Sequence, residues 1–252
     1  MRHGAVLLDT VLLAAMPRSA NADLQVRLPH VDYQEIEIEH SGLVKFGPRG
    51  SSTDNAQNHT VSVGYGVLPW WKIELEGEMS AGGGRNLFWE ATTLENTFAL
   101  TKRGELFLDA ALFVEYSHAT GKAPNEIKIG PILYKELPPI GGVVTAHAIN
   151  LFLTREVGAD ASRATGFRGY WQSVAKFHPL LAPGFEYYAR IDDLARTETY
   201  NRQEHYLGPV LTGTHSFYPY GRLRYQVGYL FGLTSATPRG SIRWKLEYEF
   251  RF

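Results

Sequence analysis

The sequence predicts an all-β fold, a transmembrane antiparallel up-and-down β-barrel of about 12 strands. Three observations predict it. Apolar and polar residues alternate with a period of two over most of the chain, the alternating segments are long, and short turns alternate with longer polar loops. The alternative fold is a soluble barrel with a polar outside and an apolar lumen, and the number of charges on each segment argues against it.

The last segment, residues 240–252, shows the alternation most clearly. One side of a strand there is apolar or aromatic and the other is charged: Ile242, Trp244, Leu246, Tyr248, Phe250 and Phe252 against Arg243, Lys245, Glu247, Glu249 and Arg251. Helical spacing would scatter these charges around an axis, so only a strand sorts them.

Twelve segments of this kind follow one another along the chain. They cover residues 33–46, 58–67, 71–81, 87–101, 106–117, 125–134, 145–157, 165–178, 184–193, 203–214, 221–234 and 240–252. Strands of soluble proteins have about five or six residues, whereas a tilted strand that crosses a bilayer needs about nine to eleven. The length of the segments therefore favours a membrane barrel.

The connections are of two kinds. Tight or proline-containing turns are expected at 68–70, 102–105, 137–139, 179–183 and 218–220, and looser polar loops at 47–57, 82–86, 118–125, 158–165, 195–202 and 235–240. Short periplasmic turns and longer outer loops alternate in this way in outer-membrane barrels. Residues 24–29, before the first segment, are interpreted as an extra short strand or a tail.

Two short stretches resemble each other, 129–133 and 207–211, and each contains Gly-Pro. Proline cannot donate a backbone hydrogen bond to a neighbouring strand. We therefore expect a β-bulge at Pro131 and at Pro209.

Composition excludes several classes of function. The formal net charge of -1 argues against a nucleic-acid partner, since such domains usually carry a basic face. The absence of cysteine excludes disulfides and thiolate metal sites. The nine histidines are scattered along the chain, so we expect no metal site and no cofactor.

Residues 1–22 have the anatomy of a secretory signal peptide. Arg2 and His3 precede a mostly apolar stretch, and Ala20-Asn21-Ala22 forms a small-x-small cleavage site. Asp9, a charge within the apolar stretch, departs from the pattern. The prediction is a cleaved signal over 1–22 and one barrel domain over 23–252.

The final five residues, 248–252, carry a resemblance to a known class. A terminal Phe252 preceded by Phe250 and Tyr248 at alternate positions resembles the C-terminal signature of Gram-negative outer-membrane β-barrel proteins. The resemblance implies an outer-membrane location, contact with outer-membrane lipid, and recognition of Phe252 by the outer-membrane assembly machinery. It does not identify a subfamily.

A charged side chain that faces lipid destabilises the barrel. Arg or Lys on the lipid face at the bilayer midplane costs about 2–4 kcal/mol. The charged side of each strand is therefore expected to face the lumen. Nine of the eleven charges on the first five strands are acids: Glu35, Glu37, Glu39, Lys45, Lys72, Glu74, Glu76, Glu78, Glu95, Asp109 and Glu115. Strands eight to twelve are mostly basic, and barrel closure should bring Lys245 near Glu39.

These charged walls favour a narrow channel for small polar or charged solutes. Five residues are expected to line its constriction: Glu37, Glu76, Arg190, Arg224 and Arg243. No outer loop is long enough to form a large plug. The main alternative is a closed structural or interaction barrel with a salt-bridged lumen.

A lipid-modifying enzyme is a third interpretation. His118 and His215 each have a serine neighbour, but neighbours on a strand point to opposite faces. His147 has no evident serine partner, and His205 is expected near the outer edge of the tenth strand. We therefore expect no catalytic site, and we expect Tyr170 and Tyr188 to face inward mainly as space-filling groups.

Overall fold

The computed structural model describes residues 24–251, except residues 49, 52, 83–85, 160 and 163. The expected signal peptide and Phe252 lie outside the described residues. No helix in the described part is long and apolar enough to cross a bilayer.

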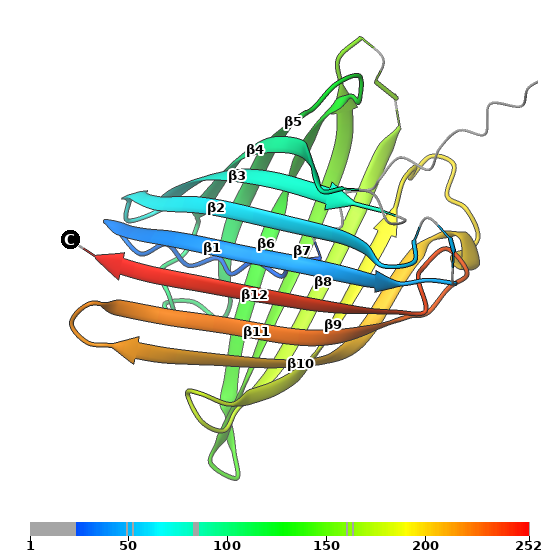
Figure 1. Cartoon of the computed structure of the whole chain (residues 1–252). Helices are drawn as coiled ribbons and strands as arrows, with labels where there is room; N and C mark the ends of the chain where they lie inside the picture. The colour runs from blue at the N-terminus through cyan, green and yellow to red at the C-terminus, as the bar shows by residue number, and fades with distance from the viewer. Residues whose placement is uncertain are drawn as a thin grey trace, which may run out of the picture.

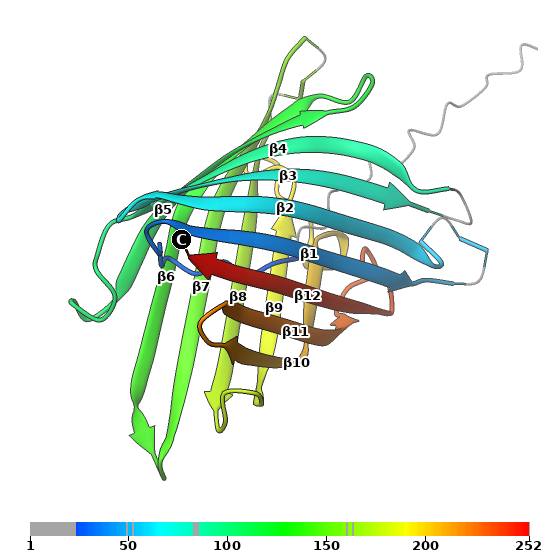
Figure 2. The ribbon, with the colours of Figure 1, turned by 60° about the vertical axis from the view of Figure 1, so that its left-hand side comes forward.

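Twelve strands in the described part form one closed antiparallel barrel, in which each strand pairs with its neighbours along the chain and β1 pairs with β12 (Figures 1 and 2). The strands are β1 (Glu35–Phe46), β2 (Ala56–Leu68), β3 (Trp71–Ala81), β4 (Phe88–Ala99), β5 (Asp109–Ala119), β6 (Asn125–Ile140), β7 (Val143–Val157), β8 (Thr165–Lys176), β9 (Ala182–Ile191), β10 (Glu204–Phe217), β11 (Gly221–Gly232) and β12 (Gly240–Arg251). The predicted fold class is confirmed, and every predicted strand corresponds to an observed one.

The two kinds of connection lie at opposite ends of the barrel. We call the end with connections 69–70, 100–108, 141–142, 177–181 and 218–220 the turn end. The loop end has connections 47–55, 82–87, 120–124, 158–164, 192–203 and 233–239. β1 begins at the turn end and β12 ends there, as an even number of strands requires.

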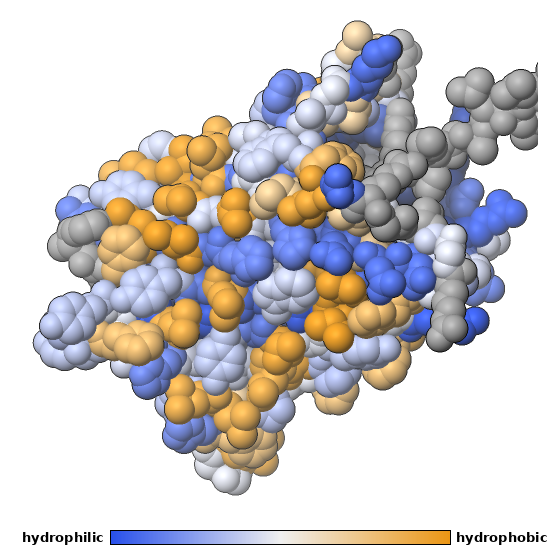
Figure 3. All heavy atoms as spheres, in the orientation of Figure 1, coloured by the Kyte–Doolittle hydropathy of each residue, from blue (hydrophilic) through white to orange (hydrophobic). Residues whose placement is uncertain are grey.

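The outer surface of the barrel is largely apolar. Outward side chains such as Ile38, Val63, Leu75, Phe185 and Leu246 are 48–57% exposed. On the face seen in Figure 3, apolar side chains spread over the strands with polar ones among them. Exposed aromatic side chains gather at the turn end: Trp70, Phe107, Phe177, Tyr218 and Tyr220. A lipid-facing surface with an interfacial aromatic girdle has this distribution.

The turn predicted at 137–139 is wrong. β6 continues through Pro138 and Pro139 to Ile140, and the chain reverses at Gly141 and Gly142, which both have positive φ. Pairing of β6 with β5 ends at Tyr134, so beyond that residue β6 is an edge strand, where proline is tolerated. The β6–β7 hairpin therefore reaches past its neighbours (Figures 1 and 2).

The bulges predicted at Pro131 and Pro209 are also wrong. Ile129 pairs with Leu153 and Ile132 with Asn150, so the register with β7 is the same on both sides of Gly130-Pro131. The β10–β11 ladder is interrupted without a shift at Gly208-Pro209 in the same way. Each Gly-Pro pair leaves a gap of two residues in the ladder and adds no extra residue.

The glycine of each pair is required because the backbone of the neighbouring strand passes close to it. A Cβ on Gly208 would lie 1.8 Å from the carbonyl oxygen of Tyr229. We expect Gly208→Ala to lower the free energy of unfolding by about 1–3 kcal/mol, because overpacking forces the backbone to shift. Gly64→Ala is the control, since its Cβ would meet nothing closer than 3.5 Å. Urea unfolding in detergent micelles checks this, and equal losses in both variants would contradict it.

Candidate functional site: the barrel lumen

The segment before β1, residues 24–34, lies inside the barrel. In Figures 1 and 2 it runs within the ring of strands. It enters at the turn end, where Gln34 donates its backbone N–H to the carbonyl oxygen of Gly66 on β2 at 2.9 Å. Its other end reaches the middle of β1, where the Gln25 amide donates to Glu39 at 2.7 Å. We call residues 24–34 the lumenal segment.

Arg27 is the charged centre of the lumenal segment. Its Nε lies 3.1 Å from Oε2 of Glu95, and an Nη contacts the other oxygen of the same carboxylate. The same Nη lies 3.6 Å from Glu76. Carboxylate oxygens of Glu74, Glu76 and Glu95 all lie within 4.8 Å of one another. The guanidinium therefore lies beside a cluster of three carboxylates. We call Glu74, Glu76 and Glu95 the acidic cradle.

The backbone of Arg27 is held by one side chain of the opposite wall. Asn150 on β7 accepts a hydrogen bond from the Arg27 N–H at 2.7 Å and donates one to the Arg27 carbonyl at 2.9 Å. The Asn150 side chain is fully buried. An amide that pairs with both backbone groups replaces the neighbouring strand that an extended segment otherwise requires.

Successive side chains of the lumenal segment point toward opposite sides of the barrel. Gln25 and Arg27 bond to carboxylates of β1 and β4. Val26 belongs to a buried cluster on the opposite side, and Leu24 packs against that cluster. The cluster includes one ring from β5 and one from each of β7 to β10, which we call the aromatic band: Phe113, Phe152, Tyr170, Tyr188 and Tyr206. Tyr170 and Tyr188 thus face inward, as expected.

The turn from the lumenal segment into β1 is tightly packed. Glu35 donates its N–H to the Asp32 carbonyl, and Gln34 has a φ of 60°. A Cβ on Gly66 would lie 2.0 Å from the Asp32 carbonyl oxygen. Glycine at position 66 therefore gives the segment room to enter the lumen.

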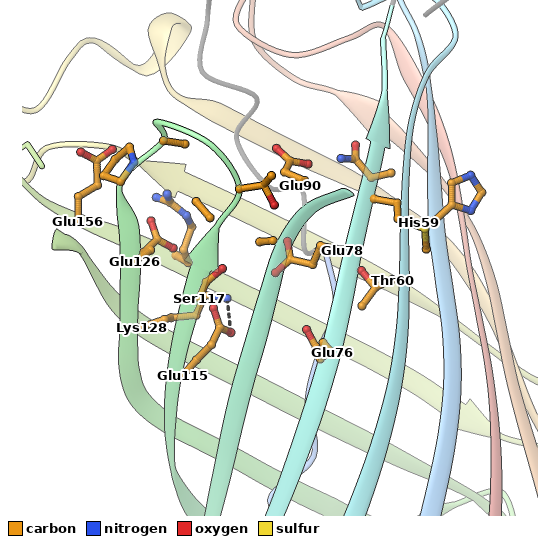
Figure 4. Close-up of a pocket in the computed structure, with 18 of the residues that line it drawn as sticks. His59, Thr60, Glu76, Glu78, Glu90, Glu115, Ser117, Glu126, Lys128 and Glu156 are labelled. Atoms are coloured by element: carbon orange, nitrogen blue, oxygen red, sulfur yellow. Dashed lines mark hydrogen bonds and ion pairs between the residues drawn. The ribbon is translucent and has the colours of Figure 1, made fainter. Parts of the chain in front are cut away.

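Among the described residues, a cavity lies inside the barrel toward each of its two ends. The loop-end cavity, about 340 Å³, is lined by residues including Glu76, Glu78, Glu115, Lys128 and Arg190. Figure 4 shows Glu76 and Glu78 of β3 and Glu115 of β5 lining it, with Lys128 bonded to Glu115. The turn-end cavity, about 280 Å³, is lined partly by Leu28 and His30 of the lumenal segment. A space of only about 80 Å³ lies along the segment itself.

His30 anchors the lumenal segment near the turn end. Its Nε2 lies 2.9 Å from Oδ2 of Asp109, and its ring meets Tyr134 edge to face. Burial lowers the pKa of His30 below its ordinary value, and the positive charge of Arg103 acts in the same direction. The hydrogen bond to Asp109 opposes this shift without cancelling it.

The lowered pKa of His30 predicts a pH dependence. The unfolded chain, with a histidine pKa near 6.5, binds the proton more tightly than the folded chain does. The free energy of unfolding should therefore fall as the pH drops through that value. Urea unfolding at about pH 7.5 and at about pH 5.5 measures the change. Between these two pH values the free energy of unfolding should fall more for the wild type than for His30→Gln. An equal loss in both would contradict the assignment.

The five residues expected at the constriction do not line one common space. Glu37 and Arg224 line the small space along the lumenal segment, and Glu76 and Arg190 line the loop-end cavity. Arg243 lies apart from both pairs, with its guanidinium bonded to the fully buried Glu186.

Most of the lumenal charges are paired. Lys72 lies 2.6 Å from Glu37, and Lys245 lies 2.5 Å from Glu39, as barrel closure led us to expect. Arg224 lies 2.8 Å from Glu249. Arg190 lies 2.7 Å from Asp192.

The residues that sequence reasoning missed are Arg27, Asn150, Gln25 and His30. Residues 24–29 form a tail, one of the two interpretations offered, but this tail lies inside the lumen. The excess of acids on the first five strands was the available signal, because a buried acidic wall needs a cation. Asn150 was a second signal, a polar residue on the same face as Ala146, Ala148 and Phe152.

The histidines weighed as catalytic groups have other surroundings. Ser117 is buried while His118 is exposed, so the two point to opposite faces. His147 lies 3.3 Å from the Thr145 hydroxyl. His205 bonds to Tyr187 and Gln203. The ring of His215 meets that of Phe217.

Comparison with known proteins finds likeness in fold. No protein-family model and no curated protein matches the sequence. Among solved structures, an outer-membrane channel from Pseudomonas putida F1 aligns with a TM-score of 0.57 and 11% identity, over 92% of this chain and 99% of that one. The NanC porin aligns with a TM-score of 0.51 and 10% identity, over 85% and 100%. At the level of fold, the resemblance noted in the sequence is confirmed: the chain is similar to bacterial outer-membrane β-barrels.

Proposed function

We propose that the protein is an outer-membrane channel that passes small polar or charged solutes through its lumen. The turn end faces the periplasm and the loop end faces the outside. The observation that carries the proposal is a polar, ion-paired lumen with a cavity toward each end, inside a barrel whose outer surface is largely apolar. A barrel with a purely structural role does not require a cavity of this size toward each end.

Export and assembly belong to the same proposal. The signal peptide over residues 1–22 is cleaved on export. The outer-membrane assembly machinery recognises the chain end at Phe252. Outer-membrane lipid then covers the apolar belt.

A closed barrel is the second candidate, and one observation favours it. The aromatic band and the buried Glu186–Arg243 pair fill much of the lumen on the side of β5–β10. In that case the ion pairs stabilise the barrel and no solute passes.

Single-channel conductance of the refolded chain in a planar bilayer separates the two candidates. Stable current steps, recorded with protein that has folded into the barrel, support a channel. A folded barrel, resistant to protease, that gives no steps would overturn the proposal and favour the closed barrel.

The proposed lining residues are Glu37, Glu76, Arg190, Arg224 and Arg243, and they are tested by charge reversal. Arg190→Glu should shift permeability toward cations, because Arg190 lines the loop-end cavity. Arg202→Glu makes the same charge change on a side chain that is 73% exposed in an outer loop, and it should have little effect. The same ion selectivity in both variants would remove Arg190 from the lining.

A further inference from the structure

We infer that Arg27 sets the ion selectivity of this lumen and that the lumenal segment forms its constriction. The inference rests on the proposed channel function and goes beyond it, because it assigns selectivity to a residue outside the barrel wall. It is carried by three observations: the charge balance at the acidic cradle, the narrowing along the segment, and the bonds that hold the segment in place.

The charge balance depends on Arg27. The acidic cradle contributes three carboxylates, and Lys72 on the wall lies 3.2 Å from one of them, Glu74. Lys72 is shared with Glu37. Arg27 contacts the other two carboxylates, Glu76 and Glu95. Without Arg27, the cradle is a negatively charged patch facing the lumen, and such a patch attracts cations and repels anions.

The lumen holds little free space around Arg27. Cavities of about 340 and about 280 Å³ lie toward the two ends, and the space along the lumenal segment is about 80 Å³. That volume holds only a few water molecules. A solute that crosses the barrel passes the segment at close range, where one charge has its largest effect.

The lumenal segment is bound to the wall at several points. Its contacts come from β1 through Glu39, from β4 through Glu95, from β5 through Asp109 and from β7 through Asn150. The Arg27 guanidinium also lies 4.8 Å from the centre of the Phe113 ring. These bonds on both sides fix the position of the Arg27 charge within the lumen.

The first test is the ion selectivity of Arg27→Gln, read from reversal potentials in a salt gradient. Loss of one unit charge at about 4 Å in water corresponds to about a fivefold gain for cations and about a fivefold loss for anions, so the cation-to-anion permeability ratio should rise by about 25-fold. Arg202→Gln, a loop variant with the same loss of charge, should leave the ratio unchanged. An unchanged ratio in Arg27→Gln would overturn the inference.

A second test does not alter the charge and does not depend on the folding of Arg27→Gln. The chain contains no cysteine, so single cysteines can be modified cleanly. Leu28 is 37% exposed and lines the turn-end cavity. A bulky thiol reagent added to Leu28→Cys from the turn side should block the current. The same reagent on Tyr218→Cys, where the side chain is 94% exposed on a turn, should not.

The outcomes separate the two proposals. If the wild type conducts and labelled Leu28→Cys conducts equally well, the lumenal segment is not the constriction, while the channel function stands. If the folded wild type and every variant carry no current, the channel function fails, and the selectivity role of Arg27 fails with it.

Discussion

Arg243→Met is expected to lower the free energy of unfolding by about 3–5 kcal/mol, the usual effect of removing one partner of a buried ion pair. Glu186 is fully buried, and the Arg243 guanidinium bonds to both of its carboxylate oxygens. Gln172 donates one further hydrogen bond to Glu186 at 2.6 Å. Without Arg243, the fully buried Glu186 carboxylate would keep the neutral Gln172 donor but lose its positively charged partner.

Urea unfolding of the refolded barrel measures this loss, and two further variants show its cause. Arg243→Met combined with Glu186→Gln removes both charges and should recover most of the stability. Lys176→Met breaks a pair with Glu136 in which both side chains are more than 40% exposed. Exposed pairs contribute about 0–1 kcal/mol, so its effect should be small. Equal losses in Arg243→Met and Lys176→Met would contradict the assigned burial.

Asn150→Leu is expected to release the lumenal segment from the wall. Leucine is close to asparagine in size, but it cannot make the two hydrogen bonds that Asn150 makes to the Arg27 N–H and C=O. Two hydrogen bonds of about 1 kcal/mol each correspond to about a thirtyfold increase in the population of the undocked segment. The barrel itself should remain folded, because Asn150 bonds to the segment.

The accessibility of a cysteine at position 26 measures this release. Val26 is only 5% exposed, so Val26→Cys should react slowly with a thiol reagent in the wild-type background. In the Asn150→Leu background the reaction should be about thirtyfold faster, as expected for reaction through local opening. Thr154→Val, on the same strand and the same face, is the control. Equal reaction rates in the wild-type and Asn150→Leu backgrounds would show that Asn150 does not hold the segment.

The barrel could be predicted from the sequence because its signal is repeated. Each strand carries its own period-two pattern, as the alternation of Glu74 and Glu76 with Leu75 shows, and the pattern alone decides which face is charged. The close agreement in strand limits follows from this local determination. The chain reversal at Gly141-Gly142 was missed because Pro138 and Pro139 are stronger local turn signals than two glycines.

The lumen contents could not be predicted in the same way. The lumenal segment is too short to show a strand signal of its own, and its partners Glu95 and Asn150 lie 68 and 123 residues away in the sequence. Pairing of Arg243 with Glu186 likewise joins residues on strands that are not neighbours in the barrel. Such contacts depend on which residues face each other across the closed barrel, and strand periodicity carries no information about that.

Single-channel conductance of the wild type and of a chain lacking residues 24–31 tests the central claim most directly. If the barrel is a channel narrowed by its lumenal segment, both proteins give current steps, and the steps of the shortened chain are several times larger. The shortened chain should also select cations more strongly, because Glu76 and Glu95 lose Arg27. Equal conductance and equal selectivity in the two proteins, with both barrels folded, would contradict the account.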